Sequence, residues 1–85
     1  MAETTTPSPQ TRFAQRVRTA GDVGALVKAQ RKRQGLTQLD LAGLGGTGNR
    51  FLVELEAGKP TVQLQKVLDM LDLLGIDVML KSRGG

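Results

Sequence analysis

The placement of glycines between residues 38 and 57 constrains the fold of this chain more than any other feature. A first helix must end near Leu44, because glycines follow at positions 45, 46 and 48. Residues 49–56 contain neither glycine nor proline, so they can form a second helix. Gly46 suits a tight turn, which needs a residue that is free to adopt a positive φ. The segment therefore predicts two short helices joined by a glycine turn.

The second of these helices is predicted to have one apolar and one polar face. Leu52 and Leu55 lie three residues apart and share the face that we assign to the core. Leu41 and Ala42 of the first helix join this core, and the small Ala42 suits a close helix crossing. Two short helices with such a turn, the second carrying polar side chains outward, are the sequence form of a helix-turn-helix. Because that unit places its second helix in the major groove, we expect a DNA-binding domain.

Composition narrows the class of protein. With 85 residues the chain holds at most one small domain, which buries too little surface to be generously stable alone, so dimerisation is a natural remedy. The net charge of +4 is compatible with a polyanionic partner but does not demand one. Cysteine and histidine are both absent, which removes disulfides, the commonest metal ligands and the commonest general base. We therefore expect no enzyme, no metal site and no cofactor.

The expected localisation follows from two segments that the sequence lacks. No apolar run approaches the roughly 20 residues of a membrane span. The N-terminus has no apolar segment of the kind found in signal peptides. We therefore expect a cytoplasmic, nucleoid-associated protein with no membrane partner.

A longer helix is predicted ahead of the two short ones. Thr19 and Asp22 have the spacing of a capping box, which predicts a helix over about 20–34 that ends before Gly35. A basic cluster in its last turn suits the helix dipole and can also reach phosphate groups. This cluster comprises Lys28, Arg31, Lys32 and Arg33.

Capping residues also mark the starts of the other helices. Thr37, with Asp40 three residues later, is a good N-cap for the first short helix, whereas Gly48 is a weaker cap for the second. Thr61 is predicted to cap a fourth helix over about 62–74. An apolar stripe at helical spacing turns this helix toward the core. The stripe consists of Leu64, Val67, Leu68, Leu71 and Leu74.

The two ends of the chain differ from the helical domain, which we place at 19–75. Residues 1–18 are poor in apolar side chains, so we expect a disordered arm, and we expect the same of the tail over 82–85. Residues 76–81 alternate apolar and polar side chains, which predicts the only β-strand of the chain or, alternatively, a frayed tail. Such a strand needs a neighbour, and the simplest is its copy in a second subunit. We therefore expect a homodimer joined through Ile76, Val78, Met79 and Leu80.

Several short motifs between about residues 19 and 81 occur together in a known family. They are Arg31, Leu36-Thr37-Gln38, Leu41-Ala42, Gly46 and Leu55-Glu56-Ala57-Gly58-Lys59. In these the chain resembles the phage-repressor-like regulators, also called the XRE or Cro/C1 type. A narrower resemblance to the HipB-like antitoxins rests on Arg50-Phe51-Leu52, Gly58-Lys59-Pro60-Thr61, Lys66-Val67-Leu68 and the closing strand. The implied fold is all-α, a lambda-repressor-like domain of four or five helices with a C-terminal strand that pairs across a homodimer.

The resemblance also implies roles for individual residues. Arg31 and Glu56 match a buried ion pair, and Gln38 matches a residue that faces DNA. From chemistry alone, Asn49 suits adenine and Arg50 suits guanine at base edges. The expected DNA-binding residues are Thr37, Gln38, Gly48, Asn49, Arg50, Val53 and Lys59. Gly45 and Thr47 depart from the residue types that are usual in the family, and the glycines at positions 43, 45, 46 and 48 together make the turn unusually flexible.

The resemblance implies a homodimeric repressor of double-stranded operator DNA that also binds a HipA-like serine/threonine kinase toxin. Two other functions remain open at this point. One is a stand-alone phage- or host-type transcriptional regulator without a toxin, and the other is a protein-interaction module that has lost DNA binding. The glycine-rich segment 43–48 is not read as a nucleotide loop, because a capped helix and not a strand precedes it.

Overall fold

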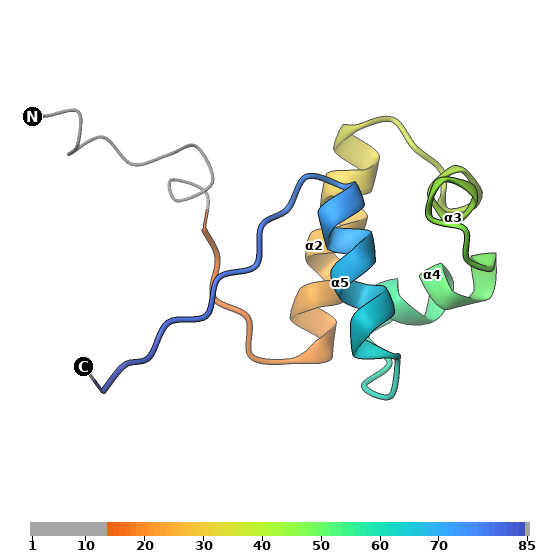
Figure 1. Ribbon diagram of the computed structural model, residues 1–85. Helices are drawn as coiled ribbons and strands as arrows, with labels where there is room; N and C mark the ends of the chain where they lie inside the picture. Colours follow the sequence, from red (N-terminus) through yellow and green to blue (C-terminus); the bar gives the residue numbers. More distant parts are fainter. Residues whose placement is uncertain (1–13, 85) are drawn as a thin grey trace, which may run out of the picture.

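The computed structural model describes residues 14–84, which form four α-helices (Figure 1). These helices are α2 (Ala20–Arg33), α3 (Gln38–Gly45), α4 (Asn49–Glu56) and α5 (Leu64–Leu73). They agree with the all-α fold of four or five helices that the sequence predicts. Most of the expected N-terminal arm, residues 1–13, and the last residue of the expected tail lie outside the described residues.

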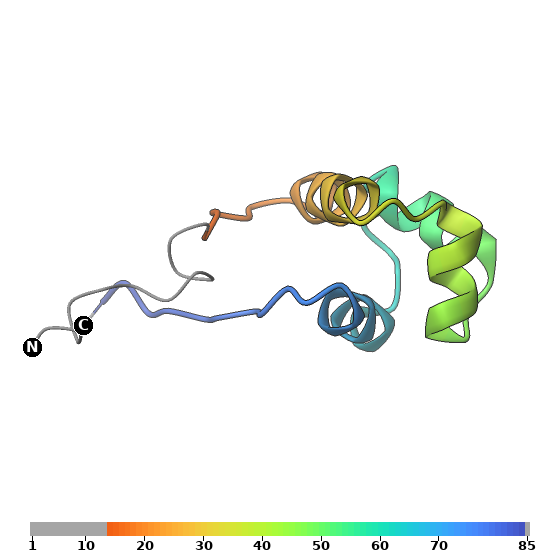
Figure 2. The ribbon, with the colours of Figure 1, turned by 90° about the horizontal axis from the view of Figure 1, so that it is seen from above.

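The helices α2 and α5 run alongside each other, and α3 lies crosswise along one side of this pair (Figures 1 and 2). The helix α4 packs against both α2 and α3. The core between them contains most of the apolar residues that the sequence assigns to it, but Leu64 at the start of α5 is 70% exposed and Leu68 is only half-buried, so those two predicted core positions are wrong. Its buried members are Val27, Leu41, Ala42, Leu52, Leu55, Val67, Met70, Leu71 and Leu74.

Two helices begin with the predicted capping boxes. The amide of Asp22 donates to Thr19 Oγ1 at 3.1 Å, and the amide of Asp40 donates to Thr37 Oγ1 at 3.0 Å. In return each carboxylate accepts from its capping residue, at 3.1 Å from Thr19 N and 2.9 Å from Thr37 N. The backbone amide of Arg18, which donates to Asp22 Oδ2 at 2.8 Å, and then that of Thr19 lower the pKa of Asp22, and the amide of Thr37 lowers the pKa of Asp40, because these bonds favour the charged carboxylate. The predicted starts of α2 and α3 are thus confirmed.

The start of α5 differs from the prediction. The helix begins at Leu64 with Gln63 as its N-cap, and no side chain caps it, so the predicted cap at Thr61 is wrong. Residues 60–62 form a turn instead, in which Val62 packs against the core. The burial of Val62 therefore outweighs the capping preference of Thr61. At the other end, Gly75 terminates the helix as expected, with a φ of 79°.

A glycine inside α2 allows this helix to cross α4 at close range. A Cβ atom added to Gly24 would lie 2.3 Å from the Leu55 carbonyl oxygen and 3.0 Å from that of Glu56. Real Cβ contacts do not reach such distances, so the crossing requires glycine at this position. The close approach brings the C-terminal end of α4 against α2.

The end of α5 is fastened to α2 by two glutamine side chains. The carbonyl oxygen of Leu74 accepts from Gln34 Nε2 at 2.9 Å and from Gln30 Nε2 at 3.2 Å. These bonds satisfy a carbonyl that the helix end would otherwise leave unpaired. They also hold the end of α5 against α2 at the point where the extended segment 76–81 begins.

The segment 76–81 forms no strand within the single chain. It leaves α5 as an extended trace that points away from the helices (Figures 1 and 2). Ile76 is held at the start of this trace, since its amide donates to Leu71 O at 2.8 Å and its side chain packs against the core. Beyond it Val78, Met79 and Leu80 are 51, 74 and 96% exposed. The described residues offer this segment no neighbouring strand with which to form a ladder.

Candidate nucleic-acid interface

The helix α4 combines a buried apolar face with an exposed polar one. Leu52 is fully buried and Leu55 is 2% exposed, whereas Asn49, Arg50 and Val53 face solvent. The helix begins after Gly48, which has an extended backbone (φ −79°, ψ 152°) and no side chain to cap the first amides. The N-terminal turn of α4 can therefore present both side chains and backbone N–H groups to an anionic partner.

The start of α3 lies beside the end of α4. Thr37 is exposed, and its hydroxyl accepts the capping hydrogen bond described above. Gln38, the first residue of α3, is half-buried, and its Nε2 donates to Glu56 Oε1 at 3.1 Å. The structure thus engages one amide proton of Gln38 within the protein, whereas the other sequence-predicted residues at this face, Asn49 and Arg50, stay exposed.

Arg31 and Glu56 meet in a buried, two-pronged ion pair. Arg31 Nε lies 2.7 Å from Glu56 Oε2, and Arg31 Nη2 lies 3.0 Å from Glu56 Oε1. The remaining guanidinium nitrogen, Nη1, donates to the Leu36 carbonyl at 2.6 Å. The side chains of Arg31 and Glu56 are only 9 and 4% exposed. The hydrogen bonds to Glu56 raise the pKa of Arg31, so the pair stays charged.

The ion pair joins four parts of the chain. Arg31 belongs to α2, Leu36 to the loop before α3, Gln38 to the start of α3, and Glu56 to the end of α4. Because every strong donor and acceptor of the pair has a partner, the geometry offsets the cost of burying two charges. This network, which we call the Arg31–Glu56 network, fixes the angle between α3 and α4.

A second carboxylate of α4 binds two cations at the surface. Glu54 Oε2 lies 3.2 Å from Arg50 Nε and 3.2 Å from Lys59 Nζ. The side chains of Arg50 and Lys59 are 89 and 47% exposed, and that of Glu54 is 28% exposed. Lys59 and then Arg50 lower the pKa of Glu54, because both cations favour the carboxylate. We call this group the Glu54 bridge; neither of its two contacts was predicted from the sequence.

The glycines in the turn between α3 and α4 differ in whether the fold requires them. Gly46 adopts the left-handed conformation (φ 65°, ψ 30°), which the sequence predicts. A Cβ atom at Gly45 would lie 2.9 Å from Met70 Cε, the end of a flexible side chain of α5 that can move aside, so this contact does not require glycine. A Cβ atom at Gly43 or Gly48 would meet nothing within 4 Å. Thr47 places its hydroxyl oxygen in the interior without a hydrogen-bond partner, so this turn carries a small energetic cost.

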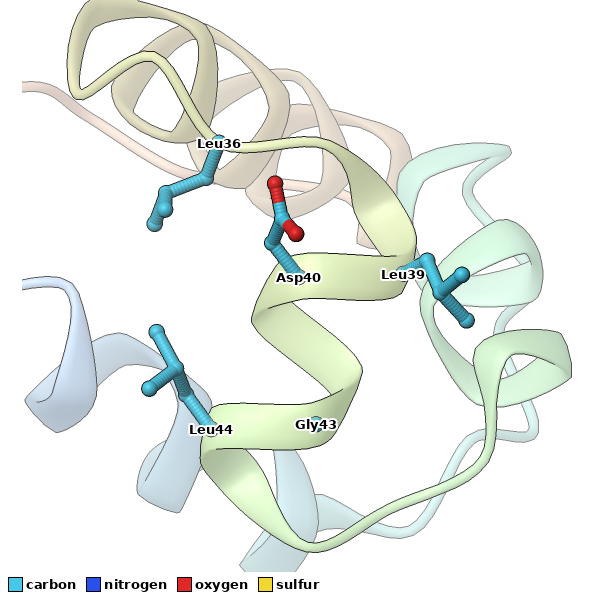
Figure 3. Close-up of a pocket in the computed structure, with 5 residues that line it drawn as sticks. All are labelled: Leu36, Leu39, Asp40, Gly43 and Leu44. Carbon is cyan, nitrogen blue, oxygen red and sulfur yellow. The ribbon is translucent and has the colours of Figure 1, made fainter.

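The outer side of α3 carries an apolar surface that sequence reasoning did not single out. Leu39 and Leu44 are 71 and 64% exposed. Leu44 points toward Leu36, and Asp40 stands between them above Gly43, whereas Leu39 points the other way (Figure 3). The sequence carries little signal for this surface, because leucines occur on all sides of α3 and only the packing of Leu41 and Ala42 shows which face is buried.

Two further classes of site were searched for in the described residues. No helix among residues 14–84 is both long and apolar enough to cross a membrane. Within the same residues, no group of three or more acidic side chains lies close enough to hold a metal ion. The polar groups of α4 and of the start of α3 therefore remain the best candidate site.

Comparisons with known proteins identify the family. A helix-turn-helix family model matches residues 27–79. The uncharacterized HTH-type transcriptional regulator y4mF of Sinorhizobium fredii (strain NBRC 101917 / NGR234) is 51% identical over 72 residues, which are 85% of this chain and 95% of that protein. Two solved complexes of HipB, with the O2 20mer and the O4 20mer, each superpose with a TM-score of 0.74 at 20% identity. They cover 82% of this chain and 97 and 99% of theirs, and show the shared fold. The chain therefore belongs to the XRE-type helix-turn-helix transcriptional regulators.

Proposed function

We propose that this regulator is a sequence-specific repressor that reads operator DNA with the exposed face of α4. The observation that carries the proposal is the division of this helix. Asn49, Arg50 and Val53 face solvent on its first two turns, while Leu52 and Leu55 anchor the opposite face in the core. Such a helix can enter the major groove without losing its own packing.

The surrounding residues supply contacts to the DNA backbone. The uncapped amides after Gly48 suit a phosphate at the helix N-terminus. Lys59 follows α4, and Thr37 and Gln38 begin α3, so they can hold neighbouring phosphates and fix the register of α4. Asn49 and Arg50 then read base edges, with adenine and guanine as the favoured partners, and Val53 can meet a thymine methyl group.

The proposed repressor acts as a homodimer. The extended segment 76–81 exposes the apolar side chains of Val78, Met79 and Leu80. Apart from the Ile76 amide, its backbone groups make no backbone–backbone hydrogen bond with the described residues, so a second copy can pair with them. Two-fold pairing would place two copies of α4 about 34 Å apart on a palindromic operator. Removal of residues 76–85 should therefore yield monomers by sedimentation analysis and weaken DNA binding. A truncated protein that remains dimeric would exclude this interface.

An antitoxin role is a finer part of the proposal. It is supported by the HipB-like motifs of the sequence and by the HipB-like fold. The partner would be a HipA-like serine/threonine kinase toxin, and the alternative is a regulator that acts without a toxin. A kinase-like reading frame next to this gene, and co-purification of its product with this chain, would support the toxin. A neighbourhood without such a frame would favour the stand-alone regulator.

A titration tests the DNA-binding proposal directly. The wild-type protein is titrated by fluorescence anisotropy against a duplex from its own promoter and against a scrambled duplex of equal length. We expect tighter binding to the promoter and a steep loss of affinity between about 50 and 200 mM salt, because bound phosphates release counterions. Equal affinity for both duplexes, or no binding at low salt, would contradict the proposal and favour an interaction module.

A matched pair of variants locates the reading face. Asn49→Ala, on α4, should lower the affinity for the promoter, whereas Gln65→Ala, exposed on α5, should leave it unchanged. An equal effect of both variants would show that α4 is not the reading helix.

A further inference from the structure

We propose that Glu54 is a specificity-determining residue, because it withholds Arg50 and Lys59 from DNA of arbitrary sequence. This inference rests on the proposed DNA-binding function and goes beyond it. The proposed function needs cations on and next to α4. The structure places both of these cations on one carboxylate of the same helix.

The geometry makes Glu54 a direct competitor of phosphate. Its Oε2 atom accepts from Arg50 Nε and from Lys59 Nζ, each at 3.2 Å. A phosphate oxygen that binds either cation must replace this hydrogen bond or share the cation with the carboxylate. The side chain of Glu54 is 28% exposed and contacts Arg50. DNA that approaches Arg50 therefore also approaches the carboxylate of Glu54.

The charges show which kind of complex is penalised. Arg50 and Lys59 carry two positive charges, and Glu54 cancels one of them at the surface that would meet DNA. A non-specific complex depends almost entirely on contacts between cations and phosphates. It therefore suffers from the lost cation contacts and from repulsion between the carboxylate and the phosphates.

A complex with the cognate operator can regain the binding free energy that a non-specific complex loses at Glu54. In the major groove a carboxylate can accept a hydrogen bond from the N4 amino group of cytosine or, beside the N7 acceptor, from the N6 amino group of adenine, whereas guanine and thymine offer it only acceptors at O6, N7 and O4. Glu54 lies one residue after Val53 and four after Arg50 on α4. When the proposed reading face enters the major groove, the carboxylate of Glu54 therefore comes close to the DNA as well. Repulsion from DNA without such a donor, combined with a hydrogen bond from a base that carries one, would give specificity through both a repulsive and an attractive element.

The simpler view is that the Glu54 bridge is an ordinary surface ion pair with little effect on function. A charge-matched pair of variants separates the two views. Glu54→Gln removes the carboxylate charge and keeps the side-chain shape. Asp72→Asn makes the same change to net charge at an exposed position on α5. Both proteins should first be shown to unfold cooperatively with circular dichroism spectra like that of the wild type.

Binding is then measured to two duplexes of equal length. One is a random-sequence duplex, and the other is obtained by in vitro selection with the wild-type protein. We expect Glu54→Gln to bind the random duplex about 3- to 10-fold more tightly at 50 mM salt, with a salt slope steeper by about 0.9, as one additional phosphate contact would give. The preference for the selected duplex should fall by a similar factor. Asp72→Asn should change each affinity by less than about twofold, because its charge lies away from α4.

Each other outcome overturns the inference. Equal tightening by both variants would show that net charge alone matters. Unchanged or weaker binding of Glu54→Gln to random DNA would show that Glu54 does not compete with phosphate. Failure of the wild type to bind either duplex would instead refute the proposed DNA-binding function, and this inference with it.

Discussion

Two carboxylates of α4, Glu54 and Glu56, lie two residues apart and have opposite environments. Glu56 is 4% exposed and is held by three hydrogen bonds from Arg31 and Gln38. Glu54 is 28% exposed and binds two flexible cations at 3.2 Å. Because residues two apart on a helix lie on different faces, the same residue type serves the interior in one case and the surface in the other.

The two environments give the two carboxylates of this short helix different roles. A buried, fully paired carboxylate cannot be released without a large cost, so Glu56 holds helices together. An exposed carboxylate exchanges its partners cheaply, so Glu54 can take part in binding equilibria. The following predictions test this division, beginning with the largest expected effect.

Replacement of the buried carboxylate should destabilise the fold. Glu56→Gln leaves the Arg31 charge buried without its counter-charge, and we expect a loss of about 3–5 kcal/mol in the free energy of unfolding. Urea denaturation followed by circular dichroism measures this loss. Glu54→Gln is the matched control on the same helix and should cost far less. Similar losses in the two variants would remove the proposed distinction.

The close crossing of α2 and α4 should also be needed for the Arg31–Glu56 network. Gly24→Ala would place a Cβ atom 2.3 Å from the Leu55 carbonyl and force the helices apart, at a cost of about 1–3 kcal/mol. Gly21→Ala, on the same helix, meets only Thr19 Oγ1 at 3.5 Å and should cost nothing. Thermal unfolding of both variants decides the matter, and equal melting temperatures would contradict the crossing described here.

The two cations of the Glu54 bridge should differ in how they act on DNA. Arg50→Ala should cost about 1–3 kcal/mol of binding and relax the preference at one base pair, whereas Lys59→Ala should weaken all sequences alike and reduce the salt slope by about 1. Competition binding against a set of single-base variants of the selected duplex measures both effects. A uniform loss from Arg50→Ala would assign it to the DNA backbone instead.

The smallest expected effect is a pH dependence of the Glu54 bridge. The folded-state pKa of Glu54 is lowered below its ordinary value of 4.5 by Lys59 and Arg50. The bridge therefore adds stability above pH 4.5, and this stability is lost as the pH falls through the lowered folded-state pKa. The difference in unfolding midpoint between wild type and Glu54→Gln should shrink as the pH falls below 4.5. A difference that stays constant down to low pH would show that the bridge adds no stability.

Features set by neighbouring residues along the chain could be predicted from the sequence. The capping boxes at Thr19 and Thr37 depend on a hydroxyl and a carboxylate three residues apart, and both form as expected. The left-handed turn at Gly46 and the core positions Leu52 and Leu55 follow from glycine preference and helical spacing. Family membership, read from these same motifs, is confirmed by the comparisons.

Features that depend on tertiary approach could not be predicted. Gly24 carries no local signal, because the carbonyls that exclude a side chain belong to α4. The same holds for the start of α5, where the burial of Val62 overrides a good capping residue. Lys59 reaches Glu54 only because the chain turns after α4. These contacts join residues of different elements, and a single sequence does not show which elements pack together.

The carbonyl of Leu74, held by Gln30 and Gln34, has a consequence for how a dimer would be phased on the double helix. The chain leaves the domain at this point, so two amide groups on α2 set the direction in which the proposed dimer arm departs. In a two-fold assembly that direction fixes the separation of the two reading heads. Since one added base pair moves the half-sites about 3.4 Å further apart along the axis and turns them by about a tenth of a helical turn, the direction of the arm would select the spacer that matches both. Operator spacing would then be encoded on α2, in residues that never touch DNA.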